Sequence, residues 1–158
     1  MPSRLATVPS VAVVATFVAV YAAITASPRS AAVKYVAKMT GAMETPANTE
    51  KGTGTARFSL NGTTLTYTIT AKDLTGPATA SHIHVGAVGV AGPPVYTITV
   101  AAAAAGKLAT GTIDLANPVG ATVSGDSLKA LFKNGNAYFN VHTAAHPKGE
   151  IRGQIVKN

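Results

Sequence analysis

The stretch TARFSLNGTTLTYTIT, residues 55–70, alternates polar and apolar side chains on either side of an Asn-Gly pair. A period of two is that of a β-strand with one apolar face, and Asn-Gly between such segments is the strongest short signal for a tight hairpin. The stretch therefore predicts two antiparallel strands joined by a turn. The composition agrees, because valine, threonine, alanine and glycine suit short strands and tight turns better than a helical bundle.

Further short strands are expected along most of the chain after residue 32. Turn residues separate them at regular spacing, which is typical of an antiparallel, Greek-key-like β-sandwich or barrel. We expect residues 127–133 to form a helical turn or a strand, and the alanine-rich residues 101–107 to form a loop or one helical turn. The other expected strands begin near residue 33 and cover residues 79–86, 95–100, 107–115, 134–143 and 148–156.

Residues 1–32 have the features of a secretory signal peptide. An arginine lies near the start, an uncharged run extends from Leu5 to Pro28, and the small residues Ser30 and Ala32 precede the expected cleavage site. The run is also long enough to be an uncleaved membrane anchor. Both interpretations place a single β-domain, residues 33–158, outside the cytoplasm, in a secreted or periplasmic location.

The chain has no cysteine. It therefore offers no disulfide and no thiolate, and any metal would be bound by nitrogen and oxygen ligands or by a thioether. The formal net charge is +7, but the lysines and arginines are scattered singly and no row of aromatic side chains accompanies them. We therefore expect a solvated basic surface and no nucleic-acid partner.

The four histidines fall into two short stretches, ASHIHVG and NAYFNVHTAAHP. On a strand His82 and His84 share one face, because residues i and i+2 point the same way. In the second stretch the same alternation places Asn140 and His142 on a polar face, with His146 four residues further along. If the two strands are neighbours, three imidazoles meet on one face and the fourth is close enough to join or cover them.

Neutral imidazoles are good ligands for copper and zinc, and a pair of strands is a rigid platform for them. We therefore predict one metal site, with copper preferred over zinc. Its predicted ligands are His82, His84, His142 and His146. The alternative is that these histidines make hydrogen bonds that hold the Gly/Pro-rich loop after His84. Met39 and Met43 add thioethers near the first strand, but core packing is the usual role of methionine.

Several polar residues are candidates for supporting the ligands. Glu150 and Arg152 are two residues apart in the last expected strand, so we expect them to share a face, with Glu150 in an ion pair with Arg152 or with a cross-strand lysine. Glu150 could instead accept a hydrogen bond from a ligating histidine and fix its tautomer. Glu44 could do the same or close the loop after the first strand, and Asn140 shares the face of His142.

The sequence contains no motif for hydrolysis or for phosphate chemistry. It has no G-x-S-x-G elbow and no acid–base pair of carboxylates, and its GAVGVAG segment, residues 86–92, lacks the lysine of a phosphate-binding loop. We therefore do not expect an enzyme, unless a bound copper ion supports a redox reaction such as superoxide dismutation.

Three blocks of the sequence, GAMETP, ASHIHVGAVGVAGPPVYTI and AYFNVHTAAHPKGEIRGQI, resemble the CHRD domain. The resemblance extends from about Val33 to Val156. It implies an all-β domain of immunoglobulin-like or superoxide-dismutase-like type in a secreted protein, and no general activity. The HIH block also resembles the copper-ligand strand of copper/zinc superoxide dismutase, although the cysteines and the zinc loop of that enzyme are missing here.

The sequence thus predicts an extracytoplasmic β-domain that binds one copper ion for carriage or storage. The alternative from another class is a metal-free module that docks an extracellular protein or matrix partner, or that has a structural role at the cell surface. The histidines separate the two, because their replacement abolishes metal uptake in the first case and affects only stability in the second. A membrane partner is expected only if the N-terminal segment stays uncleaved.

Overall fold

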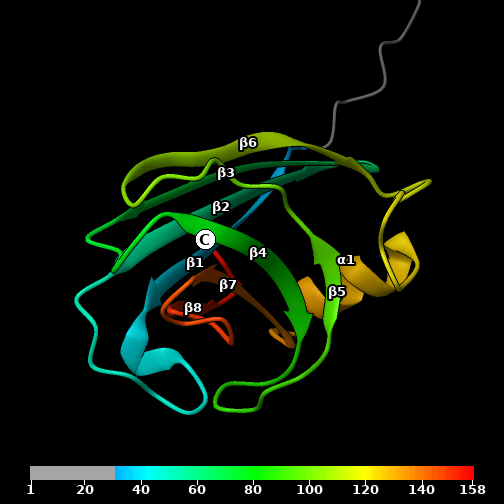
Figure 1. The fold of residues 1–158 in the computed structure, drawn as a ribbon. Coiled ribbons are helices and arrows are strands. Elements are labelled where there is room, and N and C mark those ends of the chain that lie inside the picture. The colour runs from blue at the N-terminus through cyan, green and yellow to red at the C-terminus, as the bar shows by residue number, and fades with distance from the viewer. Residues whose placement is uncertain (1–30) are drawn as a thin grey trace, which may run out of the picture.

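A computed structural model describes residues 31–158 of the chain, so the expected signal peptide lies outside the described residues except for its last two positions (Figure 1). Within residues 31–158 no helix is long and apolar enough to cross a membrane. The strands are β1 (Val33–Thr40), β2 (Thr53–Asn61), β3 (Thr64–Lys72), β4 (Ala78–Val85), β5 (Pro94–Thr97), β6 (Gly106–Asp114), β7 (Ala137–Thr143), β8 (Ile151–Gln154) and β9 (Val156–Lys157), and the helices are η1 (Gly41–Met43) and α1 (Gly125–Lys133).

The strands form one antiparallel sheet in the order β5-β4-β7-β8-β1-β2-β3-β6, with β9 paired to β1. The sheet curls on itself into a half-barrel, with β6 and β3 on one side of the curl and β7 and β8 on the other (Figure 1). The predicted all-β antiparallel fold is therefore confirmed. The sequential hairpin β2–β3 pairs along its whole length, and Gly62 in its turn has a φ of 60°, which glycine adopts without steric cost.

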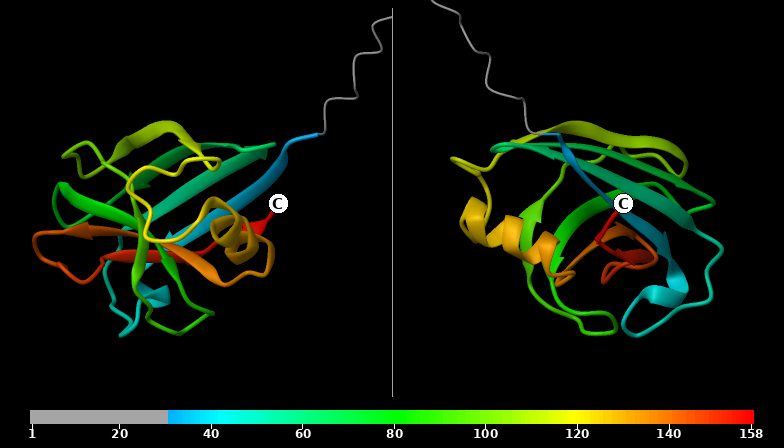
Figure 2. Two further views of the ribbon diagram at one scale, coloured as in Figure 1. Left: turned by 90° about the vertical axis from the view of Figure 1, so that its right-hand side faces the viewer. Right: turned by 180° about the vertical axis from the view of Figure 1, so that it is seen from behind.

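Residues 127–133, expected to form a helical turn or a strand, are helical. Residues 127–133 lie in α1, whose N-terminus is capped by the Ser124 hydroxyl, which accepts a hydrogen bond from the Ser127 N–H. Asp126 in the first turn and Lys133 in the last turn favour the helix dipole. The views in Figure 2 place α1 beside the curled sheet, next to β5.

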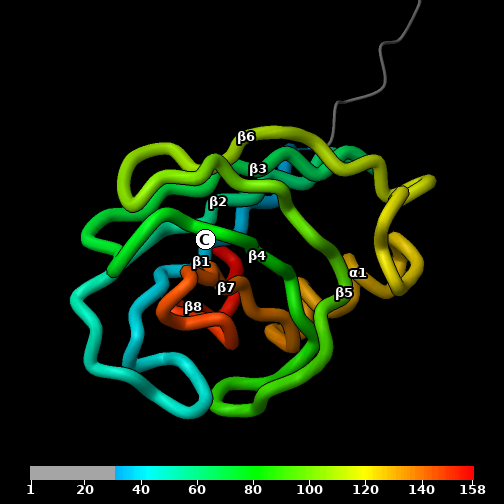
Figure 3. The backbone as a smooth tube through the Cα atoms, in the orientation of Figure 1, coloured from blue at the N-terminus to red at the C-terminus, as the bar shows by residue number. Residues whose placement is uncertain are grey.

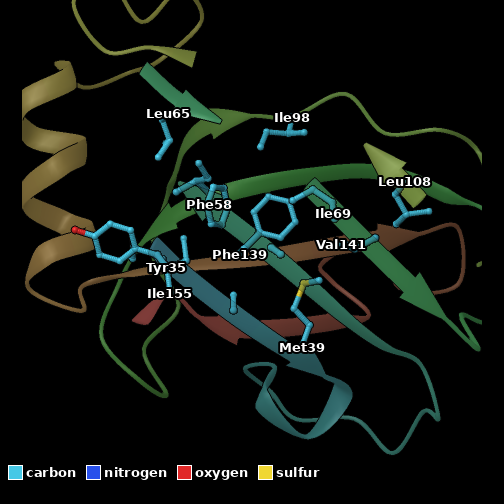
Figure 4. Packing of buried hydrophobic residues seen from close by; sticks show 14 of the residues in the cluster. Tyr35, Met39, Phe58, Leu65, Ile69, Ile98, Leu108, Phe139, Val141 and Ile155 are labelled. Carbon is cyan, nitrogen blue, oxygen red and sulfur yellow. The ribbon is translucent and has the colours of Figure 1, made fainter. Parts of the chain in front are cut away.

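The apolar core lies inside the curl of the sheet. Phe58 and Phe139 face each other across it, with ring centroids 6.0 Å apart (Figure 4). Phe132 of α1 packs edge to face on Tyr35 at 5.3 Å and on Phe58 at 5.2 Å, so the helix closes the core on its side. Each fully buried side chain of this size contributes about 1.5–3 kcal/mol to stability.

Alternation along the strands gives the sheet an inner apolar face and an outer polar face. In the β4–β7 pair, Ile83 and Phe139 are register partners and both are fully buried in the core. The intervening residues point to the other side of the sheet. Two loops lie side by side next to this outer face (Figure 3). They are residues 41–52, which follow β1, and residues 86–93, which follow β4.

Candidate metal centre

Three histidines meet on the outer face of β4, β7 and β8, which we call the histidine face. The register pairs His82 with Asn140 and His84 with Tyr138, and it places His142 opposite Ala80. One ring nitrogen of each of His82, His84 and His142 lies within 4.8 Å of the others. The two histidine-containing strands, β4 and β7, are therefore neighbours, as the sequence prediction required. Their pairing brings together three of the four predicted ligands.

His84 is buried and held from two sides. Its Nδ1 lies 2.8 Å from the carbonyl oxygen of Gly92, so this nitrogen carries the proton and donates. Its ring stacks on Tyr138, with centroids 4.7 Å apart and planes 10° apart. The remaining nitrogen, Nε2, is buried, and no hydrogen bond of good geometry reaches it within residues 31–158, although the neighbouring Asn140 side chain favours the charged ring and so opposes the lowering of the pKa of His84 by burial. His84 thus presents a free lone pair in a fixed direction.

His142 is held in the same tautomer. Its Nδ1 lies 3.1 Å from the carbonyl oxygen of Pro147 and donates to it, which leaves Nε2 as an acceptor. This Nε2 lies 2.9 Å from Nδ1 of His82, which therefore donates. His142 is 8% exposed and His82 is half-buried. The site is consequently reached from solvent on the His82 side.

The environment keeps all three rings neutral. Burial, followed by the neighbouring His142 and His84, lowers the pKa of His82 to about 4. Burial also lowers the pKa of His84 and that of His142, although the hydrogen bonds to Gly92 and Pro147 oppose the effect. A neutral imidazole is the form that binds a metal ion. The cluster is therefore ready to act as a ligand set at neutral pH.

The structure does not bring His146 into this group. Its Nε2 lies 3.3 Å from Oε1 of Glu50, and its backbone takes part in the turn between Thr143 and Gly149. The reason is that β7 ends at Thr143, so the strand alternation that aligns the other histidines no longer applies. Of the described histidines, only His146 stands apart from the cluster.

Two further buried polar groups lie beside the cluster. Asn140 occupies the middle of the histidine face, as the register partner of both His82 and Arg152, and its Oδ1 has no hydrogen-bond partner. Oε1 of Glu44 is likewise buried and unpartnered. Burial raises the pKa of Glu44 to about 7, against the opposing effect of the Arg152 charge. A Cβ at Gly149 would overlap both Glu44 and Asn140, so the close approach requires glycine there.

Arg152 holds the loop over the site, a role that sequence reasoning missed. Its guanidinium lies 3.4 Å from the centroid of Tyr138, and it donates to the carbonyl oxygens of Val90 at 2.9 Å and Ala87 at 3.2 Å. It is 2% exposed. Arg152 therefore supports Tyr138 and, through it, the ring of His84. A buried planar cation is suited to this because it can stack and donate at once.

A comparison with protein families agrees with this architecture. Residues 35–155 match the model of the CHRD domain. The chain belongs to the CHRD domain family. Domains of this family are typically extracellular. Neither curated proteins nor solved structures give a match.

One expectation for this CHRD domain is wrong. Glu150 and Arg152 do not share a face and form no ion pair, because Glu150 precedes β8 and follows Gly149, whose φ of 127° departs from the extended conformation of a strand. The Glu150 carboxylate, fully buried, accepts hydrogen bonds from the Thr75 N–H at 2.8 Å and from the Thr143 hydroxyl at 2.6 Å. It fastens a loop to β7 and makes no hydrogen bond to a histidine.

The two methionines near β1 of the CHRD domain have different surroundings. Met39 is 1% exposed and lies in the core, where Figure 4 shows it below Phe139. Met43 is 52% exposed on η1. The thioether of Met39 is therefore a packing group, and that of Met43 lies on the surface next to the loop of residues 86–93.

Proposed function

We propose that this CHRD domain binds one metal ion through His82, His84 and His142, with copper preferred over zinc. The observation that carries the proposal is the buried, unpartnered Nε2 of His84, within 4.8 Å of ligand nitrogens from the other two rings. A buried polar atom without a partner costs about 1–3 kcal/mol. A metal ion bound at this position removes that cost.

The surroundings of the ligands support this proposal. Metal-binding histidines usually donate their second ring nitrogen to a carbonyl or carboxylate, which fixes the tautomer and the direction of the lone pair. His84 and His142 both do so, with Gly92 and Pro147 as acceptors. His82 would bind through Nδ1, the nitrogen that faces His142, after its proton moves to Nε2.

The preference for copper rests on the donor set. Nitrogen ligands in general bind copper(II) more tightly than zinc. The 2.9 Å between Nδ1 of His82 and Nε2 of His142 is the length of a hydrogen bond in the metal-free protein, so it does not set the angle at a bound ion.

Carriage or storage fits the site better than catalysis. Catalysis would need a group that donates a proton to a substrate, and the Tyr138 hydroxyl is a candidate because the Tyr138 ring stacks on His84. This hydroxyl already donates to the Gly92 carbonyl at 3.1 Å and accepts from the Gly92 N–H at 3.2 Å. It is therefore occupied and is not free to donate to a substrate. A redox reaction such as superoxide dismutation stays the alternative, because His82 leaves the site accessible from solvent.

The test is isothermal titration of the protein purified from cells that express the full chain, with copper(II) and then zinc in a non-chelating buffer. One equivalent of copper should bind, tighter than zinc, and His82→Ala and His142→Ala should each weaken it at least a hundredfold. His146→Ala is the matched control and should retain the affinity within about twofold. Sequencing the N-terminus of the same protein tests cleavage before Val33.

A metal-free interaction module is the second candidate, and one surface favours it. Met43, Val88 and Val90 are 52%, 79% and 53% exposed. Met43 and Val88 line a hollow of about 280 Å³ together with Arg152. Exposed apolar side chains beside a hollow are typical of protein contact sites. Copper binding no tighter than that of the His82→Ala variant would leave this candidate in place of the metal site.

A further inference from the structure

A second outer surface, separate from the histidine face, has an unusually regular composition. We call it the threonine face, and it consists of the outward side chains of β1, β2, β3 and β6. Because these strands pair in register, their outward residues form rows across the sheet. One row consists of Lys38, Thr55, Thr70 and Lys107, and the next consists of Val36, Arg57, Thr68 and Thr110.

Positive charge runs along this face in the strand direction. Four successive rows contain one basic residue each on β1, β2 or β3, namely Lys34, Arg57, Lys38 and Lys72. All four are exposed, and neither ion pair found within residues 31–158 involves them. Rows are about 7 Å apart, so the line of charge is about 20 Å long. Among the outward residues of these four strands the only acid is Asp114, at the end of β6.

Two hollows lie along the same line. One, of about 310 Å³, is lined by Lys34, Arg57 and Thr66 among others, and covers the rows of Lys34 and Arg57. The other, of about 390 Å³, is lined by Lys38, Lys72 and neighbouring threonines, and covers the rows of Lys38 and Lys72. The hollows are therefore consecutive, and each contains basic side chains. This arrangement fits an extended chain with repeated negative charges.

The hydroxyl groups of the face indicate which kind of polyanion fits. Thr66 donates to the carbonyl oxygen of Ser59 at 3.3 Å, Thr70 to that of Thr55 at 3.4 Å, and Thr110 to that of Tyr67 at 3.1 Å. Since a hydroxyl has one proton and two lone pairs, a hydroxyl that donates to a carbonyl in this way offers its lone pairs as acceptors to a bound ligand. A sugar chain supplies hydroxyl donors, whereas a phosphate chain supplies none.

We propose that the threonine face binds a linear acidic polysaccharide lying along the strand direction. The lysines and Arg57 contact its acidic groups, and the threonine hydroxyls accept from its sugar hydroxyls. Nucleic acid fits less well because no exposed aromatic side chain lies on these rows to stack on bases. A lipid surface fits less well because, of the large exposed apolar side chains within residues 31–158, only Val156 pairs with a strand of this face. The proposal is independent of the metal site.

The experiment is a titration of the protein purified from cells that express the full chain with alginate, a linear polyuronate. EDTA is present throughout, so that a failure of the metal proposal does not affect the result. The test variant is Lys38→Gln with Arg57→Gln. The matched control is Lys133→Gln with Lys148→Gln, which removes the same charge from exposed positions outside the face. We expect at least a tenfold loss of alginate affinity in the first variant and less than a twofold loss in the second.

A second variant tests the hydroxyl groups without changing charge. Thr66→Val with Thr70→Val should weaken alginate binding about threefold and leave the binding of inorganic polyphosphate, a polyanion without donors, unchanged. Equal losses in the two charge variants, or no measurable binding of alginate, would overturn the proposal. Tighter binding of polyphosphate, duplex DNA or phosphatidylglycerol vesicles than of alginate would also overturn it.

Discussion

The histidine face and the threonine face belong to the same curled sheet and follow the same alternation, yet they differ in what covers them. The loop of residues 86–93 and the turn of residues 144–149 contact the histidine face through Arg152, His84 and His142. The threonine face has no such covering among residues 31–158, and its basic residues are exposed.

The covering loops, rather than the residue types, therefore decide what each polar strand face can bind. Under the loops, each polar group needs a defined partner, because an unpaired buried group is costly. The unpartnered nitrogen of His84 therefore points to a ligand with specific geometry. On the threonine face, water hydrates the basic side chains. Their positive charge can then attract a flexible polyanion.

The largest expected contrast is between the two arginines of the described chain. Arg152→Met should lower the free energy of unfolding by about 3 kcal/mol, because it removes the stacking on Tyr138 and the hydrogen bonds to the 86–93 loop. Arg57→Met should change it by less than about 0.5 kcal/mol, since this side chain is exposed. Urea denaturation of both variants measures the difference. Equal effects would show that the covering of Arg152 is unimportant.

A smaller contrast is expected between two threonines. Thr143→Val should cost about 1–2 kcal/mol, because the buried carboxylate of Glu150 loses the hydroxyl that lies 2.6 Å away. Thr110→Val removes an exposed hydroxyl from the threonine face and should stay within about 0.5 kcal/mol. Thermal unfolding monitored by circular dichroism compares them. A larger loss for Thr110→Val would show that the hydrogen bond of Thr143 to Glu150 is not the more stabilising of the two.

The smallest expected effect is a pH dependence of the metal-free protein. Because the folded-state pKa of His82 is about 4 and its ordinary value is 6.5, the unfolded chain binds more protons in this window and stability falls as pH decreases through it. Solvent screening of the half-exposed ring limits the loss to about 1 kcal/mol. His82→Gln should flatten the dependence measured by urea denaturation between these pH values, and an unchanged slope would contradict the assignment.

Glu44 provides the opposite sign in nearly the same window. Its folded-state pKa is about 7 and its ordinary value is 4.5, so the folded protein holds the extra proton and stability falls as pH rises between these values. Glu44→Gln should therefore make the decline toward acid steeper than in the unsubstituted protein. A shallower decline would show that Glu44 is ionised in the folded state.

The parts of the fold that follow from alternation could be predicted. The Asn-Gly turn set the β2–β3 hairpin, and the pattern of AYFNVHT correctly placed Phe139 and Val141 in the core, with His142 on the opposite face. Alternation also predicted that His82 and His84 share a face. These inferences hold because the side-chain period of a strand is fixed by its backbone geometry.

The misplaced residues lie where that geometry stops. Glu150 precedes β8 by one residue. Because Gly149 before it has a positive φ, the side chain of Glu150 points toward Thr75 and away from Arg152. His146 lies beyond β7 and pairs with Glu50. The contact of Arg152 with Tyr138 and the loop after β4 depends on strand order, which a single sequence does not encode locally.

Electron paramagnetic resonance of the protein loaded with one equivalent of copper(II) reports directly on the atoms that bind the ion. We expect hyperfine structure from three imidazole nitrogens, reduced to two in His142→Ala and unchanged in His146→Ala. A spectrum that is unaffected by His142→Ala, or one that loses a nitrogen in His146→Ala, would contradict the assignment of His82, His84 and His142 as the ligands.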